Sequence, residues 1–312
     1  MKFNIMLSKI AKPIFFILIL VALLGFINSP TALLLGFLFT FIFSNPYLKQ
    51  SQKAIQILLK VAVVGLGFGM FIKETLQTSK DGLSLTFYSI VLTVAFGIIL
   101  TKWLKLDRKL GHLITSGTSI CGGSAIAAVS PVINADGKTI SLALGVVFLL
   151  NSVALLIFPP IGSILNLTQH QFGLWAAIAI HDTSSVVGAA LSYGDEALKI
   201  ATTVKLSRTL WIIPLSVFSM FLFKSKGQKI KIPYFIFLFI LAILINSYEI
   251  LPAVISSNIV LISKRLLIVT LFLVGTTVSF SDIKQTGFKP IVLALSLWIF
   301  ISIFSLVYII YQ

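Results

Sequence analysis

The stretch Thr115–Val132, TSGTSICGGSAIAAVSPV, breaks a hydrophobic pattern that otherwise predicts a membrane-crossing helix. Gly122 and Gly123 have no Cβ atom, and each weakens a helix interior by about 1 kcal/mol relative to alanine. Three hydroxyl side chains lie beside these glycines in the sequence: Thr118, Ser119 and Ser124. The stretch therefore predicts a helix that is interrupted part-way along its length.

The composition of the surrounding chain is that of a membrane protein. Of its 312 residues 58% are hydrophobic and only 11% are charged, and the mean hydropathy of +1.07 excludes a soluble globular domain. Inside a bilayer, backbone groups that a helix break frees persist only where protein or a water-filled cavity satisfies them. We therefore expect the interruption to line a site rather than to face lipid.

Apolar runs of about 20 residues predict an all-α polytopic membrane protein with about 11 transmembrane helices in a single transmembrane domain, residues 1–312. The runs cover residues 13–28, 30–44, 54–72, 83–101, 111–133, 139–158, 171–192, 198–223, 232–248, 259–280 and 291–310. Two of them, 111–133 and 171–192, are the predicted interrupted helices. The first run lacks a small-x-small cleavage site, so we interpret it as an uncleaved helix rather than a signal peptide.

The net charge of +15 is best explained by membrane topology rather than by a polyanionic partner. If the N-terminus is cytoplasmic, most loop lysines and arginines fall inside, against Lys73, Lys80 and Lys138 outside. This asymmetry predicts a multi-pass protein with its N-terminus in the cytoplasm and its C-terminus outside. The expected partner is the lipid bilayer, and nucleic acid is not expected.

The cysteine and the acidic residues narrow the chemistry. Cys121 is the single cysteine, so the chain can form no internal disulfide and no metal cluster built on thiolates, and we expect no metal or cofactor. Of the nine acidic residues only Asp182 falls deep within a predicted span. Pathways for metal cations usually offer clustered carboxylates or carbonyls, so the substrate is expected to be an anion.

Two distant stretches resemble each other and predict an internal repeat. Gly67, Glu74 and Gln77-Thr78 match Gly275, Asp282 and Gln285-Thr286 in the same order. Each stretch ends one apolar run and precedes another, and in the predicted topology the first runs outward and the second inward. Inverted repeats are the architecture of many secondary transporters, whose sites lie near the middle of the membrane. Chance similarity between apolar segments is the alternative explanation.

A second run of small residues lies in the 171–192 span. Its members Thr183, Ser184, Gly188 and Ala190 echo Thr118, Ser119, Gly123 and Ala125, so two interrupted helices are predicted to face a common cavity. His181 and Asp182 precede this run, and a charge at the centre of a bilayer costs about 2.5 to 3.5 kcal/mol. Two interpretations stay open: proton coupling by this pair, or an Asp182 that caps a half-helix beginning at Thr183.

Two basic residues lie away from the ends of the predicted span 198–223. Lys205 and Arg208 are three residues apart, which places them on one face of a helix. They are expected either to pair with Asp182 or to bind the carboxylate, sulfonate or sulfate group of a substrate. His112 and His170 lie at predicted helix ends and are interpreted as surface groups.

Residues 116–128, SGTSICGGSAIAA, and 181–190, HDTSSVVGAA, resemble the YeiH-type (UPF0324) family of bacterial inner-membrane proteins. Its members are usually labelled sulfate exporters, which implies a transporter more firmly than it implies sulfate. The family is distantly similar to sodium/proton antiporters and bile-acid sodium symporters. That resemblance implies an interrupted core helix at 116–128, and a core domain that moves against a panel or dimerisation domain, which leaves a homodimer open. Because 116–128 contains no acidic residue, the resemblance does not extend to sodium coupling.

These observations predict a secondary active transporter that exports a small anion, such as sulfate or an organosulfonate, by alternating access with proton coupling through His181 and Asp182. The predicted substrate-binding residues are Thr118, Ser119, Gly122, Gly123, Ser124, Thr183, Ser184, Ser185, Lys205 and Arg208. A passive anion channel would have the same lining. An intramembrane enzyme that uses Cys121 with His181 and Asp182 is the third hypothesis.

Overall fold

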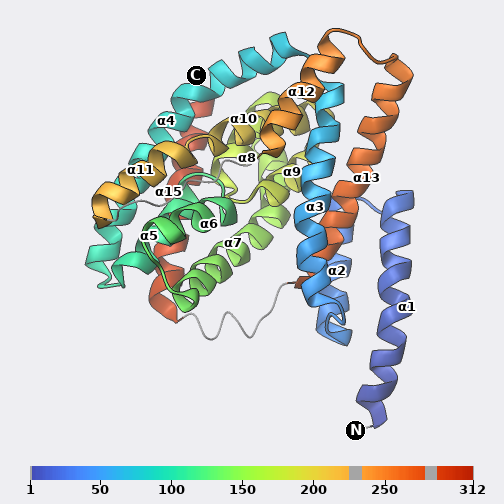
Figure 1. The fold of residues 1–312 in the computed structure, drawn as a ribbon, viewed down its shortest axis with the longest axis horizontal. Helices are drawn as coiled ribbons and strands as arrows, with labels where there is room; N and C mark the ends of the chain where they lie inside the picture. Colours follow the sequence, from blue (N-terminus) through green and yellow to red (C-terminus); the bar gives the residue numbers. More distant parts are fainter. Residues whose placement is uncertain (1, 225–233, 278–286, 312) are drawn as a thin grey trace. The chain divides into compact units, whose positions relative to one another are not determined.

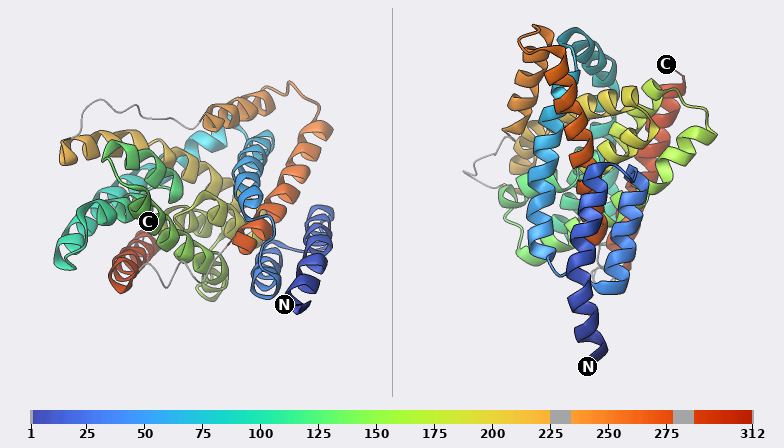
Figure 2. Two further views of the ribbon diagram at one scale, coloured as in Figure 1. Left: turned by 60° about the horizontal axis from the view of Figure 1, so that its bottom comes forward. Right: turned by 90° about the vertical axis from the view of Figure 1, so that its right-hand side faces the viewer.

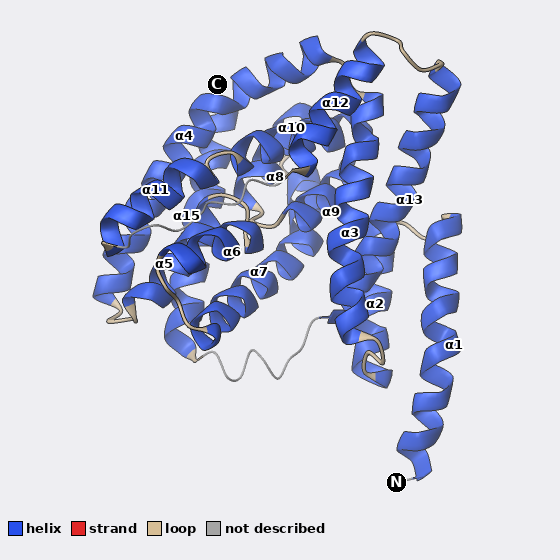
Figure 3. Ribbon diagram, viewed as in Figure 1, coloured by secondary structure: helices blue, strands red, loops and turns tan. Residues whose placement is uncertain are grey.

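The computed structural model describes residues 2–224, 234–277 and 287–311, which form helices joined by turns and loops, with no strand among them (Figures 1 and 3). The prediction of an all-α membrane protein is confirmed in this respect. Six segments of the described chain are long and apolar enough to cross a membrane: Leu48–Gly69, Gly82–Trp103, Gly137–Ile164, Asp195–Phe223, Ala253–Thr277 and Phe288–Ile310. Each overlaps a predicted span, whereas the total of about 11 spans stays a prediction.

The chain clusters into two compact units. Among the described residues, unit 1 comprises 2–74, 187–192 and 234–277, and unit 2 comprises 75–186, 193–224 and 287–311. The segments of each unit are far apart in sequence, so neither unit is a simple half of the chain.

Unit 1 is built from helices of both ends of the chain. Its elements are α1 (Lys2–Leu24), α2 (Ser29–Phe43), α3 (Leu48–Leu66), the 3₁₀ turn η1 (Gly67–Gly69), α12 (Phe235–Ser247) and α13 (Ala253–Thr277). Helix α13 packs against both α2 and α3, and α12 packs against η1 and α3 (Figures 1 and 2). Helix α13 is thus the central helix of this unit.

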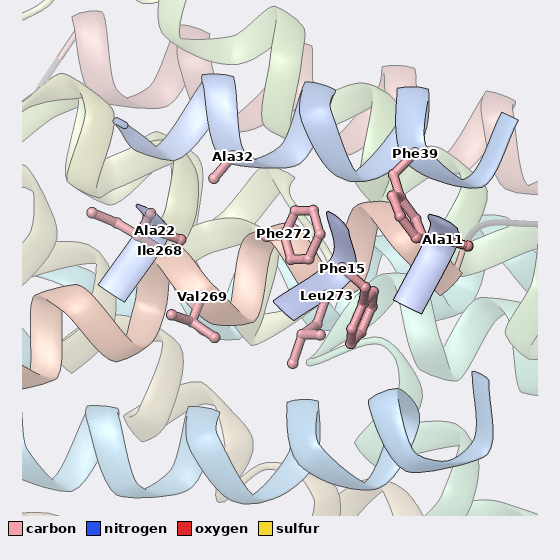
Figure 4. Close-up of a cluster of buried hydrophobic side chains, with 9 residues drawn as sticks. All are labelled: Ala11, Phe15, Ala22, Ala32, Phe39, Ile268, Val269, Phe272 and Leu273. Carbon is pink, nitrogen blue, oxygen red and sulfur yellow. The ribbon is translucent and has the colours of Figure 1, made fainter. Parts of the chain in front are cut away.

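An aromatic cluster fills the space between α1, α2 and α13. The rings of Phe15, Phe39 and Phe272 point toward one another, with centroids 5.6 to 6.3 Å apart (Figure 4). Phe272 is completely buried, and Ala22 and Ala32 pack at the same interface. Large buried rings contribute most of the apolar area that such an interface removes from its surroundings.

The glycines of the predicted repeat have different local structures. Gly67 lies in η1, where an added Cβ atom would stand 2.9 Å from the carbonyl oxygen of Phe239. Gly275 lies inside α13, where an added Cβ atom would stand 2.9 Å from the Cα atom of Gly36. Both glycines therefore allow close helix packing. Asp282 and Gln285-Thr286 lie outside the described residues, so the repeat stays a prediction.

Unit 2 holds both predicted interruptions. It contains most of α4 (Ile72–Trp103), followed by α5 (Arg108–Ser119), α6 (Gly123–Val132), α7 (Gly137–Ile164), α8 (Gln169–Ala179), α9 (Thr183–Tyr193, in part), α10 (Asp195–Thr209), α11 (Ile212–Phe223) and α15 (Phe288–Ile310). Helix α10 packs along α8, and α15 packs against α5, α7 and α8.

Side-chain caps explain where several of these helices begin. Asp107 accepts a hydrogen bond from the backbone N–H of Leu110 at the start of α5. Asp136 accepts from the backbone N–H and from the hydroxyl of Thr139 at the start of α7, and these bonds hold its pKa below the usual value. Each cap satisfies a backbone donor that a helix start otherwise leaves free.

Stacked aromatic side chains fix α8 within unit 2. The ring of Trp175 on α8 stacks on Phe158 of α7, with centroids 4.2 Å apart, and its indole N–H donates to the carbonyl of Ser302 on α15 at 3.0 Å. Phe172 stacks on Tyr193 at 3.8 Å. These contacts fix the first two turns of α8 against α7, α9 and α15.

Candidate functional site

Two helix interruptions meet in unit 2. Helix α5 ends at Ser119 and α6 begins at Gly123, whereas α8 ends at Ala179 and α9 begins at Thr183 (Figure 3). The chain therefore leaves the helical path at 120–122 and at 180–182, within the two spans where small residues predict an interruption. We call these two segments together the crossing.

Gly122 brings the two segments into contact. Its φ of +62° lies in the left-handed region that residues with a side chain rarely adopt. An added Cβ atom would also stand only 3.2 Å from the Cα atom of Asp182. Both the conformation and the close approach therefore require glycine at this position.

Lys205 joins the ends of α5 and α8. Its side chain is completely buried, and its Nζ donates to the carbonyl oxygens of Ile120 at 2.9 Å, Ile180 at 2.8 Å and Ala177 at 3.2 Å. Three acceptors require three N–H bonds, which only the charged ammonium form has. The last carbonyls of a helix have no partner within the helix and carry partial negative charge, so this cation satisfies and stabilises both helix ends.

Arg208 binds the same end of α5. Its Nε donates to the carbonyl of Ile120 at 3.1 Å, and a terminal nitrogen donates to the carbonyl of Ser119. The other terminal nitrogen donates to the hydroxyl of Ser89 on α4 at 2.9 Å. Within the described chain no ion pair joins either cation to Asp182. Lys205 instead binds backbone carbonyls, and Arg208 binds two carbonyls and the Ser89 hydroxyl.

Asn151 on α7 fixes the second interruption. Its side-chain oxygen accepts hydrogen bonds from the backbone N–H groups of His181 at 3.0 Å and Asp182 at 3.1 Å. These two N–H groups lie outside any helix, and the Asn151 side chain that binds them is buried. The Asn151 oxygen therefore supplies the acceptor that a helix would otherwise provide. The Asn151 side chain thus holds the backbone of residues 180–182 in place without a helix.

Asp182 caps α9. Its carboxylate accepts hydrogen bonds from the backbone N–H of Ser184 at 3.0 Å and from the Ser184 hydroxyl. This geometry agrees with the capping interpretation of the sequence. Proton coupling by the same group stays a prediction.

Several buried polar atoms around the crossing have no hydrogen-bond partner among the described residues. They are both ring nitrogens of His181, the side-chain nitrogen of Asn151, and the hydroxyls of Thr118 and Thr202. Buried polar groups without partners are uncommon in folded proteins, and each unpaired donor costs about 1 to 3 kcal/mol. These atoms therefore have hydrogen-bonding capacity that the described residues do not use.

The other predicted site residues differ in exposure. Thr183, Ser184 and Ser185 are buried, as is Ser119, whose hydroxyl donates to the carbonyl of Ser116. Gly123 is half-buried and Ser124 is exposed. Helix α6 has no side-chain cap at Gly122, so its first N–H groups lie at the accessible edge of the crossing.

Two functional positions were missed in the sequence, and one was misjudged. Asn151 and Ser89 hold the crossing, yet neither belongs to a recognisable motif. His112, expected at the surface, is buried, and its Nε2 lies 2.8 Å from the hydroxyl of Ser219 on α11. That expectation was wrong because α5 begins at Arg108, which places His112 inside the packed helix.

Cys121 is buried within the first interruption. Both ring nitrogens of His181 lack a partner, so no Cys121–His181 hydrogen bond is formed in the described structure. No group of three or more histidine, cysteine, aspartate or glutamate side chains is placed to hold a metal ion in the described part of the chain.

Comparison with known proteins places this chain among membrane proteins. The family model described as conserved hypothetical protein 698 matches residues 12–294. The chain is 51% identical over 296 residues to UPF0324 membrane protein PBPRB0970 of Photobacterium profundum, covering 95% of this chain and 91% of that protein. The chain belongs to the UPF0324 family.

Further UPF0324 membrane proteins show the same extent of likeness. One from Shewanella oneidensis is 44% identical over 314 residues, covering all of this chain and 99% of that protein. One from Bacteroides thetaiotaomicron is 48% identical over 291 residues, covering 91% and 87% respectively. No solved structure matches.

In this UPF0324 protein, Asn151→Leu is expected to lower the free energy of unfolding by about 2 to 4 kcal/mol, because two buried N–H groups lose their acceptor. Thermal or denaturant unfolding of the purified protein in detergent measures the loss. Ser152→Ala is the matched control, since Ser152 is buried on the same helix but only donates to the carbonyl of Phe148 within α7. Equal stability of the two variants would contradict the role given to Asn151.

Proposed function

We propose that this protein is a secondary transporter that exports a small anion, such as sulfate or an organosulfonate, by alternating access, with the crossing as its binding site. The observation that carries the proposal is the combination of excess positive charge and unpartnered donors at one buried place. The protein acts in this account as a carrier and not as an enzyme.

The fixed charges at the crossing favour an anion. Lys205 and Arg208 contribute two positive charges, and Asp182 contributes one negative charge. Each helix end carries roughly half a unit charge, and the two amino ends of α6 and α9 offset the two carboxyl ends of α5 and α8. One positive charge is left over in a buried environment, where an anion gains more from it than in water.

The donors at the crossing suit an oxyanion. All three donors of Lys205 are taken by carbonyls, so Lys205 supplies charge rather than a direct contact. Direct contacts come in this proposal from the hydroxyls of Thr118 and Thr202, the imidazole of His181, and the backbone N–H groups at Gly123 and Ser124. Ser119, Gly122, Thr183, Ser184 and Ser185 shape the same site.

Proton coupling is assigned to His181 with Asp182. An imidazole that has two free ring nitrogens can take up a proton when an anion arrives, which keeps the charge of the site balanced. In this proposal the negative charge of the arriving anion offsets the repulsion between the protonated ring and the cations Lys205 and Arg208. A pH gradient would then drive net anion movement.

The alternatives have less support. A passive anion channel would have the same lining, and the predicted internal repeat favours a carrier over a channel. An enzyme that uses Cys121 needs a base near the thiol, and His181 forms no hydrogen bond with it. We also propose that the protein is a homodimer in the bacterial inner membrane, with its N-terminus in the cytoplasm and its C-terminus outside it.

Thr118→Val tests the site without disturbing the fold. The Thr118 hydroxyl is buried and has no partner in the described structure, so its replacement by a methyl group is expected to leave the ligand-free protein equally or more stable. Sulfate at 100 times its dissociation constant is expected to stabilise the wild type by about 2.7 kcal/mol. The variant is expected to bind sulfate several-fold more weakly in thermal-shift titrations.

Ser256→Ala is the matched control, because Ser256 is also buried and without a partner but lies on α13 in unit 1. It is expected to bind sulfate as the wild type does. Stabilisation of wild type, Thr118→Val and Ser256→Ala by the same amount would place the anion elsewhere, and no stabilisation of the wild type by sulfate or any organosulfonate would overturn the proposal.

A further inference from the structure

A separate basic pocket lies at the turn between α4 and α5. It has a volume of about 310 Å³ and lies within unit 2. Its lining includes the apolar residues Ile98, Leu222 and Phe223 and the cationic residues Lys102, Lys105 and Arg108. None of these residues belongs to the crossing, so the transport proposal does not use this pocket.

The apolar and cationic parts of the lining are contributed by different positions. Ile98, Leu222 and Phe223 lie within helices that qualify as membrane spans, whereas Lys105 and Arg108 lie beyond the end of α4. The candidate spans Gly82–Trp103 and Asp195–Phe223 both end at this pocket. The pocket thus lies where two candidate spans end, with Lys105 and Arg108 beyond the end of Gly82–Trp103.

The polar atoms inside the pocket are already satisfied, whereas the lysines are not. The hydroxyls of Thr101 and Thr115 donate to carbonyls of their own helices, and His112 pairs with Ser219. Lys102 and Lys105 are exposed and have no hydrogen-bond or ion-pair partner among the described residues. A ligand would therefore meet these two ammonium groups first.

Arg108 is fixed in position at the pocket. A terminal nitrogen donates to the carbonyl of Leu222 at 3.0 Å, and the guanidinium lies 4.9 Å from the centre of the Phe223 ring. These contacts hold the side chain against the end of α11 and leave further N–H groups free to bind an acceptor. A guanidinium held in one position can bind a phosphate group through directed hydrogen bonds.

Lys105 adopts a backbone conformation that suits another residue better. Its φ is +52°, in the left-handed region where glycine is accommodated at no cost and a lysine costs about 1 kcal/mol or more. Trp103, 75% exposed just before this turn, is typical of the membrane–water interface.

We propose that this pocket binds an anionic phospholipid, with its headgroup phosphate on Lys102, Lys105 and Arg108 and an acyl chain along Ile98, Leu222 and Phe223. An anionic phospholipid has a negatively charged headgroup and apolar chains, so it suits a pocket with cationic side chains at its opening and apolar side chains inside. A zwitterionic lipid would make the same apolar contacts but would gain less binding energy from the cationic side chains.

Native mass spectrometry of the full chain in a neutral detergent tests this assignment. Phosphatidylglycerol is titrated against phosphatidylcholine with the same acyl chains, and inorganic phosphate is titrated separately. The wild type is expected to prefer phosphatidylglycerol, and Lys102→Gln with Lys105→Gln is expected to weaken that binding at least about tenfold. Both lysines are exposed, so the variant is expected to keep the wild-type melting temperature.

Lys49→Gln with Lys53→Gln is the matched control, since it removes the same charge from exposed positions on α3 in unit 1. It is expected to bind phosphatidylglycerol as the wild type does. Equal affinity for the two lipids, or an equal loss in both double variants, would overturn the assignment. Inorganic phosphate that displaces phosphatidylglycerol at equal concentration would show a free-anion site instead of a lipid site.

Discussion

Lys205→Met is expected to destabilise the protein by at least about 3 kcal/mol, because the carbonyls of Ile120, Ala177 and Ile180 would lose their donor while still buried. Methionine preserves much of the side-chain volume, so the loss reports hydrogen bonds and charge rather than a cavity. The expected result is a large fall in melting temperature in detergent, together with loss of anion binding, since both helix ends of the crossing depend on this one side chain.

Lys199→Met is the control for this experiment. Lys199 lies on the same helix, α10, but its side chain is exposed. Its replacement is expected to change the free energy of unfolding by about 0.5 kcal/mol or less. If Lys205→Met melted at the temperature of Lys199→Met, the carbonyl bonds would not hold the crossing together.

Gly122→Ala is expected to have a comparable effect for a different reason. An alanine at a φ of +62° is strained by about 1 to 3 kcal/mol. Its Cβ atom would also stand 3.2 Å from the backbone of Asp182, so the two interruptions would have to separate. We expect a fall in stability of about 3 kcal/mol and no measurable anion transport, measured by thermal unfolding and by flux into proteoliposomes.

Gly145→Ala provides the contrast. Gly145 lies inside α7, and an added Cβ atom there meets no other atom within 4 Å. The substitution is expected to stabilise the helix by up to about 1 kcal/mol and to leave transport unchanged. A Gly122→Ala protein as stable as Gly145→Ala would show that residue 122 does not need glycine.

The positions of both interruptions could be predicted from the sequence, the first from Gly122 and Gly123 within an apolar span and the second from Asp182 as a cap before Thr183-Ser184. The long spans could be predicted equally well, since length and hydropathy define them. The pairing of the two interruptions was suggested by the echo between Thr118-Ser119 and Thr183-Ser184. In the structure these segments do meet, through Gly122 and Asp182.

The partners of the buried cations could not be predicted in the same way. Lys205 and Arg208 bind backbone carbonyls, which every residue carries, so no side-chain pattern identifies them. Asn151 was detectable in principle: a lone amide in the apolar run 139–158 is costly to bury and must find a partner. Which partner it finds depends on how α7 packs against residues 180–182, and sequence periodicity carries no such information.

The most direct test of the central claim is sulfate flux in proteoliposomes, with and without a pH gradient, for wild type and Thr118→Val. If the crossing is the transport site, the wild type moves sulfate or an organosulfonate faster when a pH gradient is imposed. The folded Thr118→Val protein then moves the same anion several-fold more slowly at concentrations below saturation. Folded wild-type protein that moves no anion, or a Thr118→Val protein whose flux equals that of the wild type, would contradict the account.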